Sequence, residues 1–355
     1  MNEKLKNGIA LSLIFQVILV KWIGSHREWV EAYYSNGWYP LVSRFWRIIL
    51  GWIPFSVGDL IYLGLLLLAI RYVVVQHKKI RKHPFLFLRN IVLVLSVAYF
   101  TFNLMWGLNY YREPLAKSMG LRDTITQEEL VKFVEKLVKR TNEAQFRITK
   151  DTATKVEIPY SRSDIFTKTI EGYQSIGLLY PFLVYNNPSI KQSLFSTGLS
   201  YMGYAGYLNP FTNEAQVNGI MPKFRFPVVC GHEVGHQVGY SAENETNFIG
   251  FLVTVGNPDP YFQYAAYAYA LSYCLSDVKR KDKVQFNRLY GDLNGGIKKN
   301  FKEEVDFWEA HANPMEPVFE SIFDTFLKSN NQAQGIKSYR SIVSLLVTYY
   351  EDREL

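Results

Sequence analysis

Apolar residues divide the chain into two parts with different patterns. Three long apolar stretches lie in the first third, at about Ile9–Ile23, Leu60–Val75 and Ile91–Leu108. Each approaches the roughly 20 residues that a helix needs to cross the hydrocarbon core of a bilayer. Beyond residue 108 the apolar residues recur every three or four positions, which is typical of helices that bury one face. We therefore predict a membrane region of about three transmembrane helices over 1–108 and a mainly α-helical domain over 109–355.

The segment between the first two apolar stretches carries a further membrane signal. Its aromatic residues include Trp22, Trp29, Trp38, Trp46 and Trp52. Tryptophan is enriched at the level of the lipid headgroups, where its ring can be both buried and hydrated. The stretch Trp29–Leu50 is therefore predicted to lie along the membrane surface as an amphipathic helix.

Charge is divided as unevenly as hydrophobicity. Residues 1–108 hold 12 of the 39 basic side chains and 4 of the 32 acidic ones, so they carry a formal net charge of +8 and the remainder carries −1. The basic balance belongs to the membrane part, which argues against a nucleic-acid-binding surface. Lysine and arginine cluster between Arg71 and Arg89, and the positive-inside rule places such a loop in the cytoplasm. We expect a multi-pass protein of the cytoplasmic (inner) membrane with its C-terminal domain outside the cytoplasm.

The most informative chemical pattern is His-Glu-Val-Gly-His at residues 232–236. Pro227 suits the first turn of a helix and Gly239 suits its end, so a helix over about Pro227–Val238 would contain the pattern. Histidines four apart lie on one helical face and can bind one Zn²⁺. The intervening Glu233 can then act as a general base toward water, which is the arrangement of zinc hydrolases.

Catalytic zinc usually has three protein ligands, and the next segment offers two carboxylates. Ser241 resembles the N-cap of a second helix, and Glu243 and Glu245 lie in or near its first turn. Asn244-Glu245 resembles the pair that supplies the third ligand in glutamate-zinc peptidases, so Glu245 is preferred and Glu243 is the alternative. The other carboxylate could orient a histidine or favour the helix dipole.

Other candidate groups in the outer domain are fewer. His311 could approach the site as an oxyanion donor, although a lone histidine in such a stretch is more often a surface or capping residue. Cys230 and Cys274 lie in apolar surroundings, which favours buried free thiols, while an extracytoplasmic location leaves one disulfide possible. Further helices are predicted near residues 163–176, 260–279, 282–298, 315–328 and 335–350.

The segment Ser193–Pro222 interrupts the helical pattern just before the histidines. It is rich in glycine and contains the alternating residues Ala215-Gln216-Val217-Asn218. We predict loops and a small β edge there. In zinc peptidases an edge strand at this place pairs with extended substrate backbone, but a purely structural hairpin explains the pattern equally well.

Several blocks, in order, resemble the bacterial membrane proteins that contain domain of unknown function 3810. The blocks are Phe55–Asp59, Trp106–Arg112, Pro210–Ala215, Gly231–Glu233 and Glu245–Phe248. That family typically reads His-Glu-Leu-Ala-His-Gln and then Glu-x-Glu-Ala-Asn-Phe. Val234, Gly235 and Thr246 depart from this pattern conservatively. The resemblance implies a membrane-anchored protein with a site like that of glutamate-zinc peptidases, and no established substrate.

These patterns predict a membrane-anchored zinc metallopeptidase with a zincin-like outer domain. His232, His236 and Glu245 would hold Zn²⁺, and Glu233 would be the catalytic base. The substrate would be a peptide or an envelope protein. The alternative is a non-catalytic envelope protein with a structural metal site or a partner-binding domain. Glu233 disfavours that alternative, because a structural site needs no base.

Overall fold

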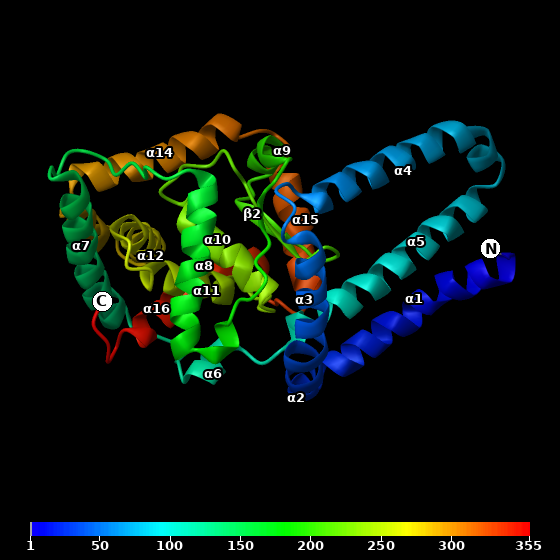
Figure 1. Cartoon of the computed structure of the whole chain (residues 1–355), viewed down its shortest axis with the longest axis horizontal. Helices are drawn as coiled ribbons and strands as arrows, with labels where there is room; N and C mark the ends of the chain where they lie inside the picture. Colours follow the sequence, from blue (N-terminus) through cyan, green and yellow to red (C-terminus); the bar gives the residue numbers. More distant parts are fainter. Residues whose placement is uncertain (1) are drawn as a thin grey trace.

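The computed structural model describes residues 2–355, and its N-terminal part is mainly helical. The helices are α1 (Glu3–Gly24), α2 (Arg27–Trp29), η1 (Val30–Trp38), α3 (Tyr39–Leu50), α4 (Val57–Lys82) and α5 (Pro84–Met105). Within the described residues, α1, α4 and α5 are long and apolar enough to cross a membrane. All three project from one side of the compact part of the molecule that residues 107–349 form, which we call the body. The N-terminus and the α4–α5 connection lie together at the end farthest from it (Figure 1). The predicted N-terminal membrane helices are confirmed.

Polar residues inside the apolar stretches pair with each other. Helices α1 and α5 pack along one another. The Nε2 of Gln16 on α1 donates to the Oγ of Ser96 on α5 at 2.9 Å, and the Oγ of Ser12 lies 3.2 Å from the same oxygen. Such bonds satisfy polar groups that would otherwise lie in hydrocarbon, which explains how the first stretch accommodates Gln16.

The segment that links α1 to α4 lies where the spanning helices meet the body (Figure 1). The predicted amphipathic stretch Trp29–Leu50 covers the end of α2, η1 and α3, and its last part, α3, has an exposed apolar face and a buried face. Leu41, Phe45 and Ile48 are exposed on one face, while Tyr39 and Ser43 are buried on the other. The hydroxyl of Tyr39 donates to the carbonyl of Gln237 at 2.8 Å. The inner face of α3 is therefore part of the body of the molecule.

The rest of the chain forms a mainly helical body with a small sheet. Its elements are η2 (Gly107–Tyr111), α6 (Leu115–Met119), α7 (Gln127–Thr149), α8 (Arg162–Leu179), η3 (Pro181–Leu183), β1 (Ile190–Gln192), α9 (Ser196–Tyr201), β2 (Gly206–Asn209), β3 (Glu214–Val217), α10 (Phe226–Gln237), α11 (Glu243–Val255), α12 (Pro260–Lys281), α13 (Lys283–Gly291), α14 (Gly295–His311), α15 (Glu316–Ser329), η4 (Gly335–Ser341) and α16 (Ile342–Tyr349). Within the described residues, the sheet has the order β1-β3-β2, with β1 parallel and β2 antiparallel to β3.

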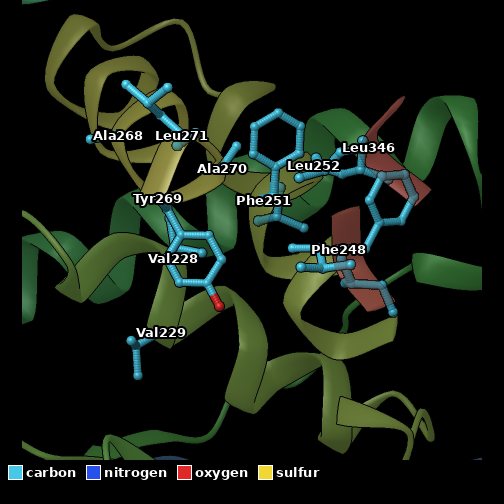
Figure 2. Close-up of a cluster of buried hydrophobic side chains, with 14 of the residues drawn as sticks. Val228, Val229, Phe248, Phe251, Leu252, Ala268, Tyr269, Ala270, Leu271 and Leu346 are labelled. Atoms are coloured by element: carbon cyan, nitrogen blue, oxygen red, sulfur yellow. The ribbon is translucent and has the colours of Figure 1, made fainter. Parts of the chain in front are cut away.

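The main core lies where α10, α11, α12 and α16 meet (Figure 2). Val228 comes from α10, Phe248 and Phe251 from α11, Leu271 from α12 and Leu346 from α16, and all five are buried. Burying side chains of this size contributes about 1.5–3 kcal/mol each before the entropy of folding is counted. The two helices that carry the candidate ligands are thus held by the best-packed part of the molecule.

Two sequence predictions in this part of the chain need correction. The helix expected over 282–298 is two helices, because Asn294 leaves the helical path between them and its backbone N–H donates to Asn142. The alternating segment Ala215–Asn218 contributes β3, which is the central strand and not the edge. The edge beside the candidate site is β2, which begins at Gly206 and has no alternating pattern.

Candidate metal centre

Helices α10 and α11 form a tight antiparallel hairpin. Gly239 has φ 97°, which a residue with a side chain rarely adopts, and this allows the chain to turn back at once. The helices then pack at backbone distance, since a Cβ on Gly231 would lie 2.9 Å from the Cα of Gly250. Gly235 similarly faces Thr246, because a Cβ on Gly235 would lie 3.2 Å from the threonine methyl group. The glycines thus bring the start of α11 against the histidine face of α10.

Three side chains converge between the two helices. The Oε2 of Glu243 lies 3.3 Å from the Nε2 of His232 and 3.7 Å from the Nε2 of His236. Ligands about 2.0–2.1 Å from a tetrahedral zinc lie roughly 3.3 Å from one another. The two distances from the carboxylate oxygen to the imidazole nitrogens are therefore close to the separation of ligands around one zinc ion.

The far side of each imidazole is fixed by a hydrogen bond. The Nδ1 of His236 lies 2.8 Å from the carbonyl oxygen of Tyr240, which can only accept, so Nδ1 carries the proton. The Nδ1 of His232 lies 2.8 Å from the Oδ1 of Asn247, and the hydroxyl of Tyr269 donates to the same oxygen. Nε2 is consequently the ring nitrogen of each histidine that faces Glu243. Partners of this kind set the tautomer and the orientation of histidines that bind metals.

The electrostatics of this cluster favour a cation between the three side chains. Burial alone would lower the pKa of His236, but the charge of Glu243 outweighs it and raises that pKa to about 9. Burial would raise the pKa of Glu243, and the two histidines instead hold it below its usual range. Among the described residues, no hydrogen bond of good geometry reaches the Oε2 of Glu243. A proton or a metal ion would satisfy this buried oxygen.

Glu233 is a second carboxylate close to both histidines. Its side chain is buried and its Oε2 has no hydrogen-bond partner among residues 2–355. Burial raises the pKa of Glu233 to about 7, although both histidines pull it down. Its ligand atom lies within 4.8 Å of those of His232 and His236. Glu233 is therefore placed to exchange a proton with a molecule held at the centre.

The structure places Glu243, and not the preferred Glu245, beside the histidines. Successive helical residues are turned by about 100°, so side chains two apart point to nearly opposite sides and only one can face α10. The Oε1 of Glu245 accepts a hydrogen bond from the backbone N–H of Leu115 at 2.7 Å. Burial raises the pKa of Glu245 to about 7. Ser241 also differs from prediction, because α11 begins after Ala242 and the Ser241 hydroxyl donates to the carbonyl of Asn109.

Residues just after the last spanning helix support the end of α10, and motif reasoning had given them no role. The Nε1 of Trp106 donates to the carbonyl of His236 at 3.2 Å. Arg112 donates to the carbonyl of Gly239 at 2.9 Å and its guanidinium lies over the ring of Tyr240. In the sequence, these residues stood out only because Trp106–Arg112 is one of the blocks that resemble domain of unknown function 3810.

The remaining candidate groups lie away from the three ligands. His311 is part-buried at the end of α14, where its ring contacts Tyr201 and Phe307. Cys230 and Cys274 are buried free thiols, as expected.

A cavity of about 1070 Å³ lies near the site, and Tyr273 is part of its lining. The hydroxyl of Tyr273 lies 3.4 Å from that of Tyr269, and the Tyr269 hydroxyl donates to Asn247, the residue that bonds His232.

Comparison with known proteins identifies the family of the chain but does not indicate an activity. No curated protein and no solved structure matches the chain. The model of a family described as "Protein of unknown function (DUF3810)" matches residues 34–347. The match runs from η1 to α16 and includes both spanning helices α4 and α5 and the candidate metal centre. The chain therefore belongs to the DUF3810 family, as its sequence blocks had indicated.

Proposed function

We propose that this protein is a membrane-anchored zinc metallopeptidase that cleaves peptides or envelope proteins outside the cytoplasm. One observation carries the proposal. The Oε2 of Glu243 lies 3.3 Å and 3.7 Å from the Nε2 atoms of His232 and His236, and Glu233, a second buried carboxylate, has its ligand atom within 4.8 Å of those of both histidines. A structural zinc site is usually closed by four protein ligands, whereas a catalytic site has three and would leave Glu233 free for proton transfer.

The donor set fits Zn²⁺ better than a hard cation. Two neutral imidazole nitrogens and one carboxylate oxygen are typical of catalytic zinc, whereas Ca²⁺ and Mg²⁺ prefer sets made of oxygen atoms alone. Three protein ligands also leave a fourth position for water or substrate. When bound, zinc would supply Lewis-acid chemistry that polarises a peptide carbonyl and acidifies water.

Glu233 would carry the proton transfers of hydrolysis. Its carboxylate would accept a proton from the attacking water and deliver it to the nitrogen of the departing amine. The buried environment that raises the pKa of Glu233 to about 7 suits a group that must gain and lose a proton near neutral pH. Asn247 and the carbonyl of Tyr240 would meanwhile hold the two imidazoles in position.

Strand β2 would position an extended substrate over Glu233. It is an edge strand of the described sheet, so one side of its backbone is not paired with another strand. A Cβ on Gly206, the first residue of β2, would lie 2.5 Å from the Oε1 of Glu233. A peptide that paired with this edge would therefore pass close to the general base.

The arrangement of the spanning helices supports an extracytoplasmic site. The N-terminus and the α4–α5 connection lie at the end farthest from the body (Figure 1). That connection carries Lys78, Lys79, Arg81 and Lys82. If the positive-inside rule holds for this basic end, it is cytoplasmic and the body lies on the opposite side of the membrane.

The decisive variant is Glu233→Gln in the full chain, purified in detergent or nanodiscs. The amide keeps the size of the side chain and removes the base. Zinc content should remain that of the parent, while cleavage of a mixed peptide library should fall by about 10²–10⁴-fold. Equal cleavage by both proteins would remove the catalytic role of Glu233 and favour a binding or structural function.

A further inference from the structure

Helix α15 has its apolar side on the outside of the molecule. Val318, Ile322 and Phe326 follow one another at four-residue spacing, so they form a single stripe along the helix. Their exposed fractions are 45%, 62% and 39%, and Met315 just before the helix is 51% exposed. We call these four residues the α15 stripe. A contiguous exposed stripe of this kind differs from the scattered apolar residues found on most water-soluble surfaces.

The charged residues of the same helix lie on the side opposite the α15 stripe. Glu320, Asp324 and Lys328 line the 1070 Å³ cavity, together with Arg225 and Tyr273 from the body. The side of α15 that packs on the body contains the fully buried Leu327, as in an ordinary amphipathic helix, so the α15 stripe is a further apolar surface that the body leaves uncovered. An apolar environment outside the body would cover this surface.

The neighbours of the α15 stripe indicate what that environment is. The ring of Phe326 lies 6.1 Å from that of Phe102 on the spanning helix α5, between ring centroids. The α15 stripe is thus continuous with the surface of the transmembrane helices. Figure 1 shows α15 on the side of the body from which the spanning helices project, and running across their direction. A helix in this position would lie parallel to a membrane that α1, α4 and α5 cross.

We propose that the α15 stripe docks on the lipid bilayer and that α15 is an interfacial membrane helix. Amphipathic helices of this type bury their apolar face about 5–10 Å into the boundary between headgroups and acyl chains. The acidic residues of α15 are no obstacle, because Glu320 and Asp324 face the cavity and not the lipid. Helix α3, with its exposed Phe45, would provide a second contact on the same surface.

Docking of α15 would also fix where the metal centre lies. The hydroxyl of Tyr204 donates to the carbonyl of Phe319 at 3.4 Å, close to the start of β2. The ring of Phe326 lies 6.0 Å from that of Tyr110, and the ring of Trp106 lies 5.0 Å from Tyr110 and 6.0 Å from His236, between centroids. Helix α15 therefore reaches from the edge strand to the ligand side of the site. A bilayer in contact with this helix would hold the metal centre close to the membrane surface.

Site-directed labelling of the full chain in nanodiscs tests the docking directly. Ile322→Cys would carry an environment-sensitive fluorophore, with lipids bearing a shallow nitroxide as quenchers. The native Cys230 and Cys274 are fully buried, so labelling should be selective. Phe146→Cys on α7 is the matched control, because Phe146 is 48% exposed and α7 lies on the far side of the body. Leu66→Cys on α4 gives the signal of a position within the membrane.

The proposal predicts that lipid nitroxides quench the label at 322 and not the label at 146, and that aqueous iodide does the opposite. Iodide access to residue 322 without lipid quenching would overturn the proposal. Protection of residue 322 from both quenchers would also overturn it, because a second copy or another protein would then cover the stripe. These readouts need no enzymatic activity, so they are independent of the proposed peptidase function.

Discussion

The Nε2 of His232 and the Oε2 of Glu243 lie 3.3 Å apart although they belong to different helices. The distance depends on the sharp turn at Gly239 and on the close packing of Gly231 against Gly250. Larger residues at these glycines would separate the helices and open the site. The glycines are therefore as important to the proposed metal centre as the side chains that face it.

Asn247 should control zinc affinity without touching the metal. Its Oδ1 fixes the Nδ1 proton of His232 and also accepts from Tyr269. We expect Asn247→Ala to weaken zinc binding or activity by roughly 10–100-fold, as is usual for residues that orient a ligand. Competition with a chromogenic chelator measures the affinity. Asn257→Ala is the control, since Asn257 is equally buried but donates to Lys168. Equal zinc affinity in the two variants would contradict the orienting role.

Gly206→Ala should separate catalysis from metal binding. The added methyl group would lie 2.5 Å from the Oε1 of Glu233 and 2.6 Å from the carbonyl oxygen of Gln216. Glu233 or β2 must shift, so we expect peptide cleavage to fall while zinc stays bound. Gly198→Ala is the matched control, because nothing lies within 4 Å of its Cβ position. Unchanged cleavage in Gly206→Ala would show that β2 and Glu233 do not act together.

The sequence was sufficient to place the histidines but not to choose the third ligand. Helical periodicity fixes His232 and His236 on one face, so their convergence could be predicted without a structure. The choice between Glu243 and Glu245 depends on where α11 begins and how it is rotated. The N-cap of α11 is Ala242, one residue later than the expected Ser241, and in this helix, packed through the glycine contacts, Glu243 faces α10. Boundaries of helices are poorly defined by local sequence, so this detail required tertiary packing.

The membrane part shows the same division between local and long-range information. Hydropathy was enough to locate α1, α4 and α5, because each span is a local property of composition. The hydrogen bonds from Trp106 and Tyr39 to the end of α10 join residues more than a hundred positions apart. Periodicity contains no information about such pairs. The sequence likewise predicted a helix near residues 315–328. It did not indicate that the α15 stripe faces away from the body.

Removal of the metal should lower the thermal stability of the protein. A ligand present at about 1,000 times its Kd stabilises the folded state by about 4 kcal/mol, and a chelator abolishes this contribution. We expect a chelator to lower the Tm of the parent protein and zinc to restore it. His236→Ala should unfold at a temperature that neither treatment changes. If neither the chelator nor zinc changed the Tm of the parent protein, the folded protein would not contain the proposed zinc site.

The orientation of the chain in the membrane can be checked with reporter fusions. An enzyme that is active only outside the cytoplasm should be active when fused after Leu355 and silent when inserted at Lys79, in the basic α4–α5 end. The expectation follows from the positive-inside rule. The reverse result would place the metal centre in the cytoplasm and would exclude envelope proteins as substrates.

Zinc content of matched glutamine variants tests the central claim most directly. The full chain should be purified as parent, Glu243→Gln and Glu245→Gln, and zinc measured per chain after dialysis against a weak chelator. Both carboxylates are buried near the start of α11, so the variants are comparable in site and in size. We predict close to one zinc in the parent and in Glu245→Gln, and loss of most of it in Glu243→Gln. Zinc kept by Glu243→Gln and lost by Glu245→Gln, or no zinc in the parent, would contradict the centre described by His232, His236 and Glu243.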